Sequence, residues 1–143
     1  RELRKVHQFN TFSIAAPLQH AIARYLSLCP DAWSGLSAFF ERKRDLLSEC
    51  LRDSGLKTLR AAGTYFLLVD YGSLSRAGDL EFSDRLIREA KVATIPLSPF
   101  YAEPPPMTLL RLCIAKKDET LTAAAERLRS FAVGCRASLT RAP

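Results

Sequence analysis

The apolar residues of this sequence change their spacing at Gly55, and this change limits the folds that the chain can adopt. Before Gly55 they recur every three or four residues, which is the spacing of one side of a helix. After Gly55, the stretch LKTLRAAGTYFLLVDYG contains two strand-like runs around an AAGT turn, which predicts a hairpin. Long helices followed by a few strands favour one small sheet covered by helices. We therefore predict an α+β fold.

Two helices are expected in the first part of the chain. Pro17 suits the first turn of a helix that continues through residues 18–28. Asp31 is expected to cap a longer helix over about residues 32–54, and Gly55 to end it. The first ten residues, RELRKVHQFN, are amphipathic and contain neither an apolar signal core nor a starting Met. We therefore expect the chain to begin inside a longer protein.

Strands and helices alternate in the rest of the sequence. Asp79 is expected to open a helix over residues 80–90, and Asp118 to cap a last helix that Gly134 closes, with residues 136–143 as a frayed tail. The prolines of the loop SPFYAEPPP exclude a helix and a central strand there. The predicted sheet is mixed or antiparallel with helices on one main face, and its strands lie near residues 57–60, 65–70, 92–95 and 108–115.

The composition excludes several classes of protein. The chain has 143 residues and no run of about 20 apolar residues, so we expect a soluble domain without a membrane span. The formal charge is +6, but acidic and basic residues alternate in stretches such as ERKRD, so nucleic-acid binding is not expected. The cysteines and histidines lack metal-ligand spacing, so no metal site is expected, and the thiols are interpreted as buried groups of a cytoplasmic protein: Cys29, Cys50, Cys113 and Cys135.

One charged residue, Arg111, interrupts the apolar run TLLRLCIA at residues 108–115. In a strand, Arg111 lies on one face with Leu109 and Cys113, and the other face is apolar. A buried charge is costly unless it has a partner. Either the strand is at an edge and the arginine reaches water, or it pairs with Asp70 or Glu81, or its planar guanidinium binds the carboxylate of a ligand through two hydrogen bonds.

Several segments resemble a known family. RKVHQFNTFSIAAPLQHAIARYL, FFERKRDLL, AGTYFLLVDY, VATIPLSPFY and LLRLCIAKKDETLTAAAERL occur in the order and spacing of the C-terminal part of class I/II pyridoxal-phosphate aminotransferases. The subgroup that the chain resembles contains methionine, kynurenine and glutamine transaminases. The resemblance implies the small C-terminal domain of fold-type I enzymes. It assigns residues 1–30 to the end of the large domain and an interface segment, 31–135 to the small domain, and 136–143 to a tail.

The resemblance also implies roles for individual residues. Arg111 occupies the position of the arginine that binds the α-carboxylate of the substrate. Phe12 and Ser13 occupy positions that reach across a dimer interface to the partner's substrate pocket, although simple packing explains such an aromatic almost as well. Phe100 and Tyr101 lie in a loop that resembles one beside the substrate side chain.

The family forms an imine between pyridoxal 5'-phosphate and a lysine of a motif that would lie upstream of this sequence. The six lysines here have charged, helical or terminal contexts, so no catalytic or cofactor-binding residue is expected among the 143, and the chain alone should be inactive. The longer protein is expected to be a homodimer that exchanges an amino group between an amino acid and a 2-oxo acid. Two other interpretations are a β-lyase acting on cysteine conjugates with the same cofactor, and a non-enzymatic interaction module with the same fold.

Overall fold

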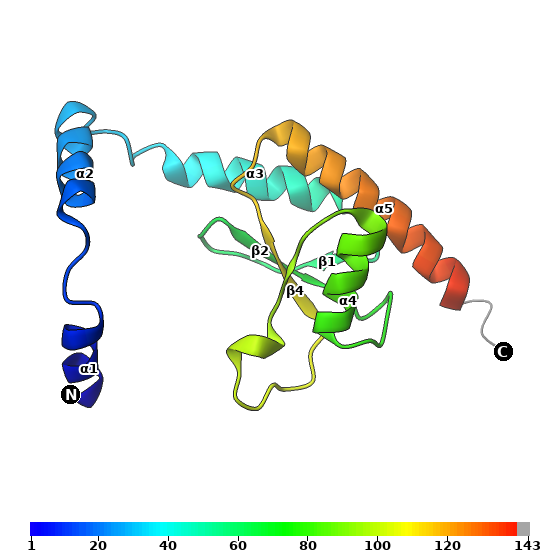
Figure 1. Cartoon of the computed structure of the whole chain (residues 1–143). Coiled ribbons are helices and arrows are strands. Elements are labelled where there is room, and N and C mark those ends of the chain that lie inside the picture. The colour runs from blue at the N-terminus through cyan, green and yellow to red at the C-terminus, as the bar shows by residue number, and fades with distance from the viewer. Residues whose placement is uncertain (140–143) are drawn as a thin grey trace. The chain divides into compact units, whose positions relative to one another are not determined.

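The computed structural model describes residues 1–139, and by its contacts the chain divides into two units, Arg1–Leu36 and Ser37–Pro143. The first unit contains the helices α1 (Glu2–Asn10) and α2 (Ala16–Leu28), drawn in blue in Figure 1. None of residues 1–36 is buried, and large apolar side chains such as Phe9 and Ile22 are exposed. This unit therefore has no core made from its own residues.

The first helices differ in part from the prediction. Helix α2 confirms the helix over residues 18–28, with Pro17 in its first turn. The helix predicted over 32–54 is shorter and spans Leu36–Cys50 as α3. At its start, the backbone carbonyl of Asp31 accepts hydrogen bonds from the N–H and the hydroxyl of Ser34, which form a turn in place of a helix cap. At its end, left-handed backbone at Asp53, with φ of 61°, stops the helix before Gly55.

Four antiparallel strands form the sheet of the second unit, in the order β1-β2-β4-β3. The predicted α+β class is confirmed, as is the hairpin of the first two strands. The strand predicted at 92–95 instead begins at Ile95, because the carbonyl of Thr94 and the N–H of Val92 bond to the preceding helix. The strands are β1 (Lys57–Thr58), β2 (Phe66–Asp70), β3 (Ile95–Pro96) and β4 (Leu109–Cys113).

Two α-helices and a π-helix follow in the second unit. Helix α4 (Asp79–Arg85) begins at Asp79 as predicted and continues into the π-helix η1 (Leu86–Ala90). Helix α5 (Asp118–Leu139) begins at the predicted residue, but it passes through Gly134 and includes the start of the predicted tail, since an isolated glycine is tolerated within a helix. Residues 140–143 of that tail lie outside the described residues. No helix within residues 1–139 is long and apolar enough to cross a bilayer.

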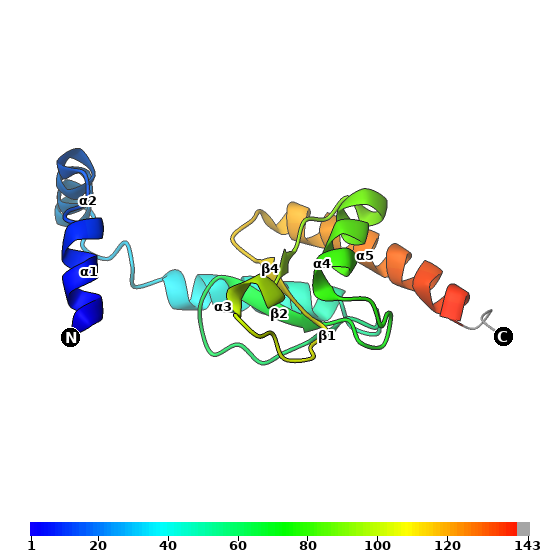
Figure 2. The same ribbon diagram turned by 60° about the horizontal axis from the view of Figure 1, so that its bottom comes forward.

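The core lies between the helices and one face of the sheet. Leu67 and Val69 of β2 and Leu110 and Leu112 of β4 are buried there, together with apolar residues of the helices such as Leu47, Phe82 and Leu128. Both views show α4 beside α5, and η1 packs against α5 (Figures 1 and 2). The helices therefore cover one face of the sheet, which leaves the side chains of the other face half-buried.

A buried ammonium group joins α3 to the start of α5. The Nζ atom of Lys43 lies 2.7 Å from Oδ1 of Asp118 and 2.5 Å from the carbonyl oxygen of Lys116. Hydrogen bonds from Lys43, and then from Arg42, lower the pKa of Asp118 below its ordinary value. This arrangement fixes the connection that follows β4.

The cysteines have reduced thiols in the structure. Cys135 is buried, and Cys50 and Cys113 are half-buried. Cys29, which directly follows α2, is exposed. The prediction that all four are buried is therefore wrong for Cys29, which belongs to the unit without a core of its own.

Candidate functional site

Arg111 lies on β4, at the centre of the half-buried face of the sheet. Its direct neighbours across the strands are Leu68 of β2 and Ile95 of β3. The predicted alternation along β4 is confirmed, because Leu110 and Leu112 are buried and Arg111 faces the other way. Since β4 pairs with a strand on both sides, Arg111 is not on an edge strand.

The guanidinium of Arg111 lies close to two aromatic rings. Its Cζ atom lies 4.1 Å from the ring centroid of Phe66 and 5.3 Å from that of Phe100. Contact with ring faces stabilises a guanidinium through cation–π attraction. Ring contacts do not satisfy its N–H groups, however, and the Nε atom is buried without a hydrogen-bond partner among residues 1–139. An unsatisfied buried donor costs about 1–3 kcal/mol, and more when it is charged.

The ion pairs considered for Arg111 are not formed within the described residues. The carboxylate of Asp70 instead accepts hydrogen bonds from the hydroxyl of Thr108 at 2.6 Å and from the N–H of Gly72 at 2.8 Å. The bond from Thr108, followed by that from Gly72, lowers the pKa of Asp70. Glu81 is exposed on α4. Asp70 therefore has its partners in the turn after β2 and at the residue before β4, and neither of them is Arg111.

A cavity of about 470 Å³ opens beside Arg111. Its walls are Phe66 and Leu68 of the sheet together with the turn formed by residues 59–64. Small residues of this turn leave room for a ligand, and the volume is within the range of small-molecule sites. Thr64 has φ of 69°, an unfavourable left-handed conformation for a β-branched residue. Such strain is often found at binding sites.

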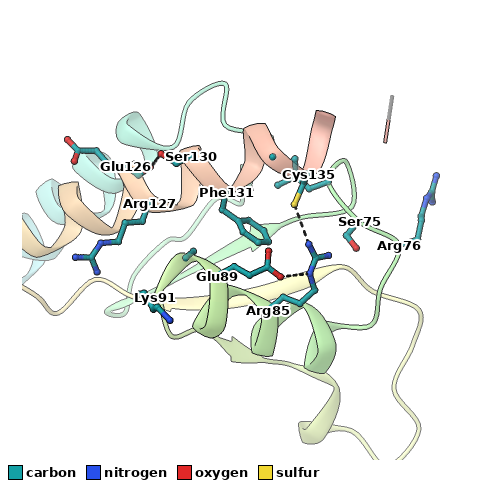
Figure 3. A pocket seen from close by; sticks show the side chains of 13 residues that line it. Ser75, Arg76, Arg85, Glu89, Lys91, Glu126, Arg127, Ser130, Phe131 and Cys135 are labelled. Atoms are coloured by element: carbon teal, nitrogen blue, oxygen red, sulfur yellow. Dashed lines mark hydrogen bonds and ion pairs between the residues drawn. The ribbon is translucent and has the colours of Figure 1, made fainter. Parts of the chain in front are cut away.

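A larger hollow of about 1080 Å³ lies between α4, η1 and α5, and its lining is shown in Figure 3. It also contains an arginine, Arg85. The Nε atom of Arg85 donates to Glu89 at 3.2 Å, and Nη2 lies 3.9 Å from the sulfur of Cys135 (Figure 3). The hydrogen bond to Glu89 is the main factor that raises the pKa of Arg85. Because Arg85 already has internal partners, we favour the smaller cavity at Arg111 as the candidate site.

The other predicted site residues fall into two groups. Phe100 ends the 3-10 helix η2 (Ser98–Phe100), where it contacts Arg111, and Tyr101 follows with an exposed side chain. Phe12 and Ser13 belong to the unit Arg1–Leu36, where both are exposed. The structure therefore brings Phe100 to Arg111, and the roles proposed for Tyr101, Phe12 and Ser13 stay predictions.

Phe66 and the turn at residues 59–64 are parts of the site that sequence reasoning missed. Period-two spacing places Phe66, Leu68 and Asp70 on one face of β2. Which residues of β2 lie beside Arg111 depends on the register with β4, where Leu68 is opposite Arg111. The aromatic residues of GTYF indicated that this segment could line a site, but only the register of β2 with β4 shows that Phe66 lies beside Arg111.

The lining of this cavity contains no lysine among the described residues of the second unit. Lys43 is buried with Asp118, and the other five are exposed: Lys5, Lys57, Lys91, Lys116 and Lys117. A lysine that forms an imine needs a lowered pKa, which requires a desolvated or electropositive pocket. None of the six therefore fits an imine-forming role.

The sequence is similar to aminotransferases. The family described as aminotransferase class I and II matches residues 1–128. Methionine aminotransferase of Escherichia coli (strain K12) is 52% identical over 130 residues, which make up 91% of this chain and 34% of that protein. Kynurenine–oxoglutarate transaminase 3 of Rattus norvegicus is 31% identical over 150 residues, or 92% of this chain and 33% of that protein.

Solved structures agree with the sequence comparison. YbdL from Escherichia coli, identified with a methionine aminotransferase function, has a TM-score of 0.78 at 51% identity, covering 90% of this chain and 34% of YbdL. N-succinyldiaminopimelate aminotransferase from Mycobacterium tuberculosis has a TM-score of 0.73 at 33% identity, and the match covers 86% of this chain and 32% of that protein. This chain spans about a third of the length of these relatives. The match over residues 1–128 and the shared fold show that the chain belongs to the aminotransferase class I and II family.

Proposed function

We propose that this chain serves an aminotransferase that exchanges the amino group between an amino acid and a 2-oxo acid, and that Arg111 binds the α-carboxylate of both. The observation that supports this role is a buried guanidinium nitrogen without a partner among residues 1–139, beside an open cavity. A carboxylate entering the cavity would accept two parallel hydrogen bonds from the guanidinium.

The surroundings of Arg111 suit a charged ligand that arrives without its water. Phe66 and Phe100 limit the access of water to the guanidinium and restrict its rotation. A charge-assisted pair is stronger in such an environment than in bulk water. A carboxylate held at two points also fixes the direction of the rest of the substrate, which favours a productive orientation.

The family uses pyridoxal 5'-phosphate, which supplies an electron sink for chemistry at the α-carbon when it is bound. The lysines of this chain do not fit the imine-forming role, because Lys43 is paired and the others are exposed. We therefore assign the chain the binding and orientation of substrate, and derive no chemical step from its own residues.

The N-terminal unit has a different proposed role. We assign residues 1–30 to the end of the large domain and an interface segment, 31–135 to the small domain and 136–143 to a tail, in a homodimeric enzyme of the cytoplasm. Phe12, which is 90% exposed, and Ser13 would then line the pocket of the partner subunit. The interface assignment is supported by the absence of buried residues in 1–36, where many large apolar side chains are exposed. Exposed apolar side chains that occur close together favour contact with another protein surface.

The test uses the full-length protein encoded by the gene of this chain. Methionine and kynurenine, the substrates named for the relatives, are offered as amino donors with a 2-oxo acid. Arg111→Ala should lower kcat/KM by roughly 30- to 1000-fold, or about 2–4 kcal/mol, the cost of leaving a buried charge without its partner. Arg129→Ala, at an exposed position of α5, is the matched control and should leave kcat/KM unchanged.

The products separate the proposed reaction from the other interpretations. Formation of a new amino acid from the added oxo acid supports transamination, whereas release of ammonia from a cysteine conjugate without exchange identifies a β-lyase. Equal activity of Arg111→Ala and the unchanged protein would contradict the carboxylate role. A full-length protein that binds neither pyridoxal phosphate nor amino acids would favour an interaction module.

A further inference from the structure

The loop that carries Phe100 is held by a carboxylate from another element. Oδ2 of Asp79, at the start of α4, accepts hydrogen bonds from the backbone N–H groups of Leu97 and Ser98, both at 2.7 Å. Oδ1 accepts from the hydroxyl of Ser98 at 2.7 Å and from the N–H of Leu80 at 2.9 Å. Three of the four donors thus belong to a segment 18 and 19 positions further along the chain.

These bonds account for a charge in a buried position. Asp79 is only 5% exposed, and all four donors are neutral groups. A buried carboxylate without hydrogen bonds would be strongly unfavourable. Burial raises the pKa of Asp79, but the bonds from Ser98, Leu97 and Leu80 outweigh it and leave the pKa below its ordinary value. Hydrogen bonds that favour the ionised form are stronger than neutral ones, so Asp79 is a firm attachment point for the loop.

The attachment point is two residues from the aromatic ring at the site. Ser98 begins η2 and Phe100 ends it. The N–H of Phe100 bonds to the carbonyl of Leu97 at 3.0 Å, and that of Tyr101 to the carbonyl of Ser98 at 3.1 Å. Both acceptors belong to the residues that Asp79 holds. The position of this short turn is therefore transmitted to Phe100 through the backbone.

Packing of its own side chain does little to fix the position of Phe100. Its side chain is 64% exposed, so its own burial contributes only part of what a core phenylalanine gains. The second ring at Arg111, Phe66, is different because it belongs to a strand paired with β4. One ring is thus placed by the sheet, and the other by the loop and its carboxylate.

We propose that Asp79 is a positioning residue for substrate binding: by holding Leu97 and Ser98 it keeps Phe100 against Arg111, and so sets the orientation in which the guanidinium receives an α-carboxylate. The proposal rests on the carboxylate role proposed for Arg111. It adds a residue of α4, which touches neither the guanidinium nor the cavity wall, to the groups that determine affinity for amino and oxo acids.

The test is a double-mutant cycle in the full-length protein. The probes are methionine as substrate and hexanoate, a carboxylate without an amino group, whose Kd is measured by calorimetry. Asp79→Asn keeps the shape of the side chain, but its amide has one accepting oxygen in place of two and carries no charge, so the four donors cannot all be satisfied and the remaining bonds are weaker. It should raise the KM of methionine and the Kd of hexanoate about tenfold, with kcat changed less than about threefold. Ser98→Ala removes one bond of the set and should give about a threefold change.

The control is Ser83→Ala, which removes a buried hydroxyl of the same helix. Its bond to the carbonyl of Thr94 at 3.2 Å supports the packing of α4 but does not hold η2. This variant should lower thermal stability and leave the KM and the Kd unchanged. If a general loosening of α4 explained the effect of Asp79→Asn, Ser83→Ala would weaken hexanoate binding too, and the inference would be wrong.

The cycle separates this inference from the proposed function. In an Arg111→Ala background, Asp79→Asn and Ser98→Ala should cause no further loss of hexanoate affinity, because they act through the guanidinium. Two results would overturn the role of Asp79 and leave that of Arg111 standing. One is an equal loss of hexanoate affinity with and without Arg111. The other is unchanged affinity in both Asp79→Asn and Ser98→Ala, while Arg111→Ala weakens binding. Unchanged binding in Arg111→Ala overturns both. Ser98→Ala decides the question if Asp79→Asn does not fold.

Discussion

The two faces of the four-stranded sheet are built by the same strands but serve different purposes. On the helix-covered face, Leu67, Val69, Leu110 and Leu112 are at most 6% exposed and form the core. On the other face, Phe66, Leu68, Arg111 and Cys113 are half-buried, and they include a charge. One step along β4 thus separates a residue of the core from a residue of the candidate site. Substitutions at neighbouring positions should therefore affect either stability or binding.

The largest effect is expected on the core face. Leu110→Ala removes a fully buried side chain between β4 and the helices, and should lower the free energy of unfolding by about 2–5 kcal/mol. Urea denaturation measures this loss. In the full-length protein, the folded fraction should keep the unchanged KM, and Leu109→Ala on the half-buried face is the control with a smaller loss of stability. A changed KM in folded Leu110→Ala would show that the two faces are coupled.

Arg111→Leu should change stability little and binding strongly, the opposite of Leu110→Ala. The free protein loses a guanidinium with an unsatisfied buried nitrogen and gains apolar contact, so the free energy of unfolding should stay within about 1 kcal/mol of the original. Hexanoate binding should weaken by about 2–4 kcal/mol. Calorimetry and urea denaturation on the same samples measure both quantities. A large loss of stability would mean that Arg111 has a structural role.

A smaller effect on stability is expected at high pH from Tyr71, a residue of the core. Burial is the main cause that raises the pKa of Tyr71 to about 12, and its hydroxyl donates to the carbonyl of Ala77 at 2.9 Å. The raised pKa means that the protonated phenol stabilises the fold below about pH 10, and that this stability is lost as the pH rises from about 10 to about 12. Tyr71→Phe should cost about 1 kcal/mol at pH 7 and remove most of this alkaline loss. Thermal unfolding between pH 7 and 11 checks it.

The smallest effect on stability is expected at low pH from Asp79, which holds the loop that carries Phe100. The pKa of Asp79 is lowered, so its ionised form stabilises the fold above the ordinary value of 3.8, and this stability is lost as the pH falls below that value toward the lower folded pKa. Asp79→Asn should therefore show a shallower loss of stability than the unchanged protein between pH 5 and 3. Parallel unfolding curves for the two proteins would contradict a stabilising role of the ionised carboxylate.

Local spacing predicted much of the fold, because it depends on neighbouring residues. The order of helices and strands and the orientation of Arg111 follow from periods of 3.6 and 2. The start of α3 did not, since the turn of Asp31 with Ser34 competes with a helix cap. The positions of Phe66 beside Arg111 and of Asp79 beside Ser98 depend on strand register and on contacts between distant segments. Such contacts are not encoded in any local pattern.

The strand order has a consequence for the sequence of events during folding. The hairpin of β1 and β2 is local, with the N–H of Leu59 bonded to the carbonyl of Leu68. The pairing of β2 with β4 joins distant parts of the sequence: at one end of this pair, the hydroxyl of Thr108 bonds to the carboxylate of Asp70, 38 positions earlier in the chain. Closing the longer loop costs more chain entropy and is slower. During refolding, the amides of β1 and β2 should therefore gain protection from exchange before those of β4, and affinity for a carboxylate should appear only in the last phase.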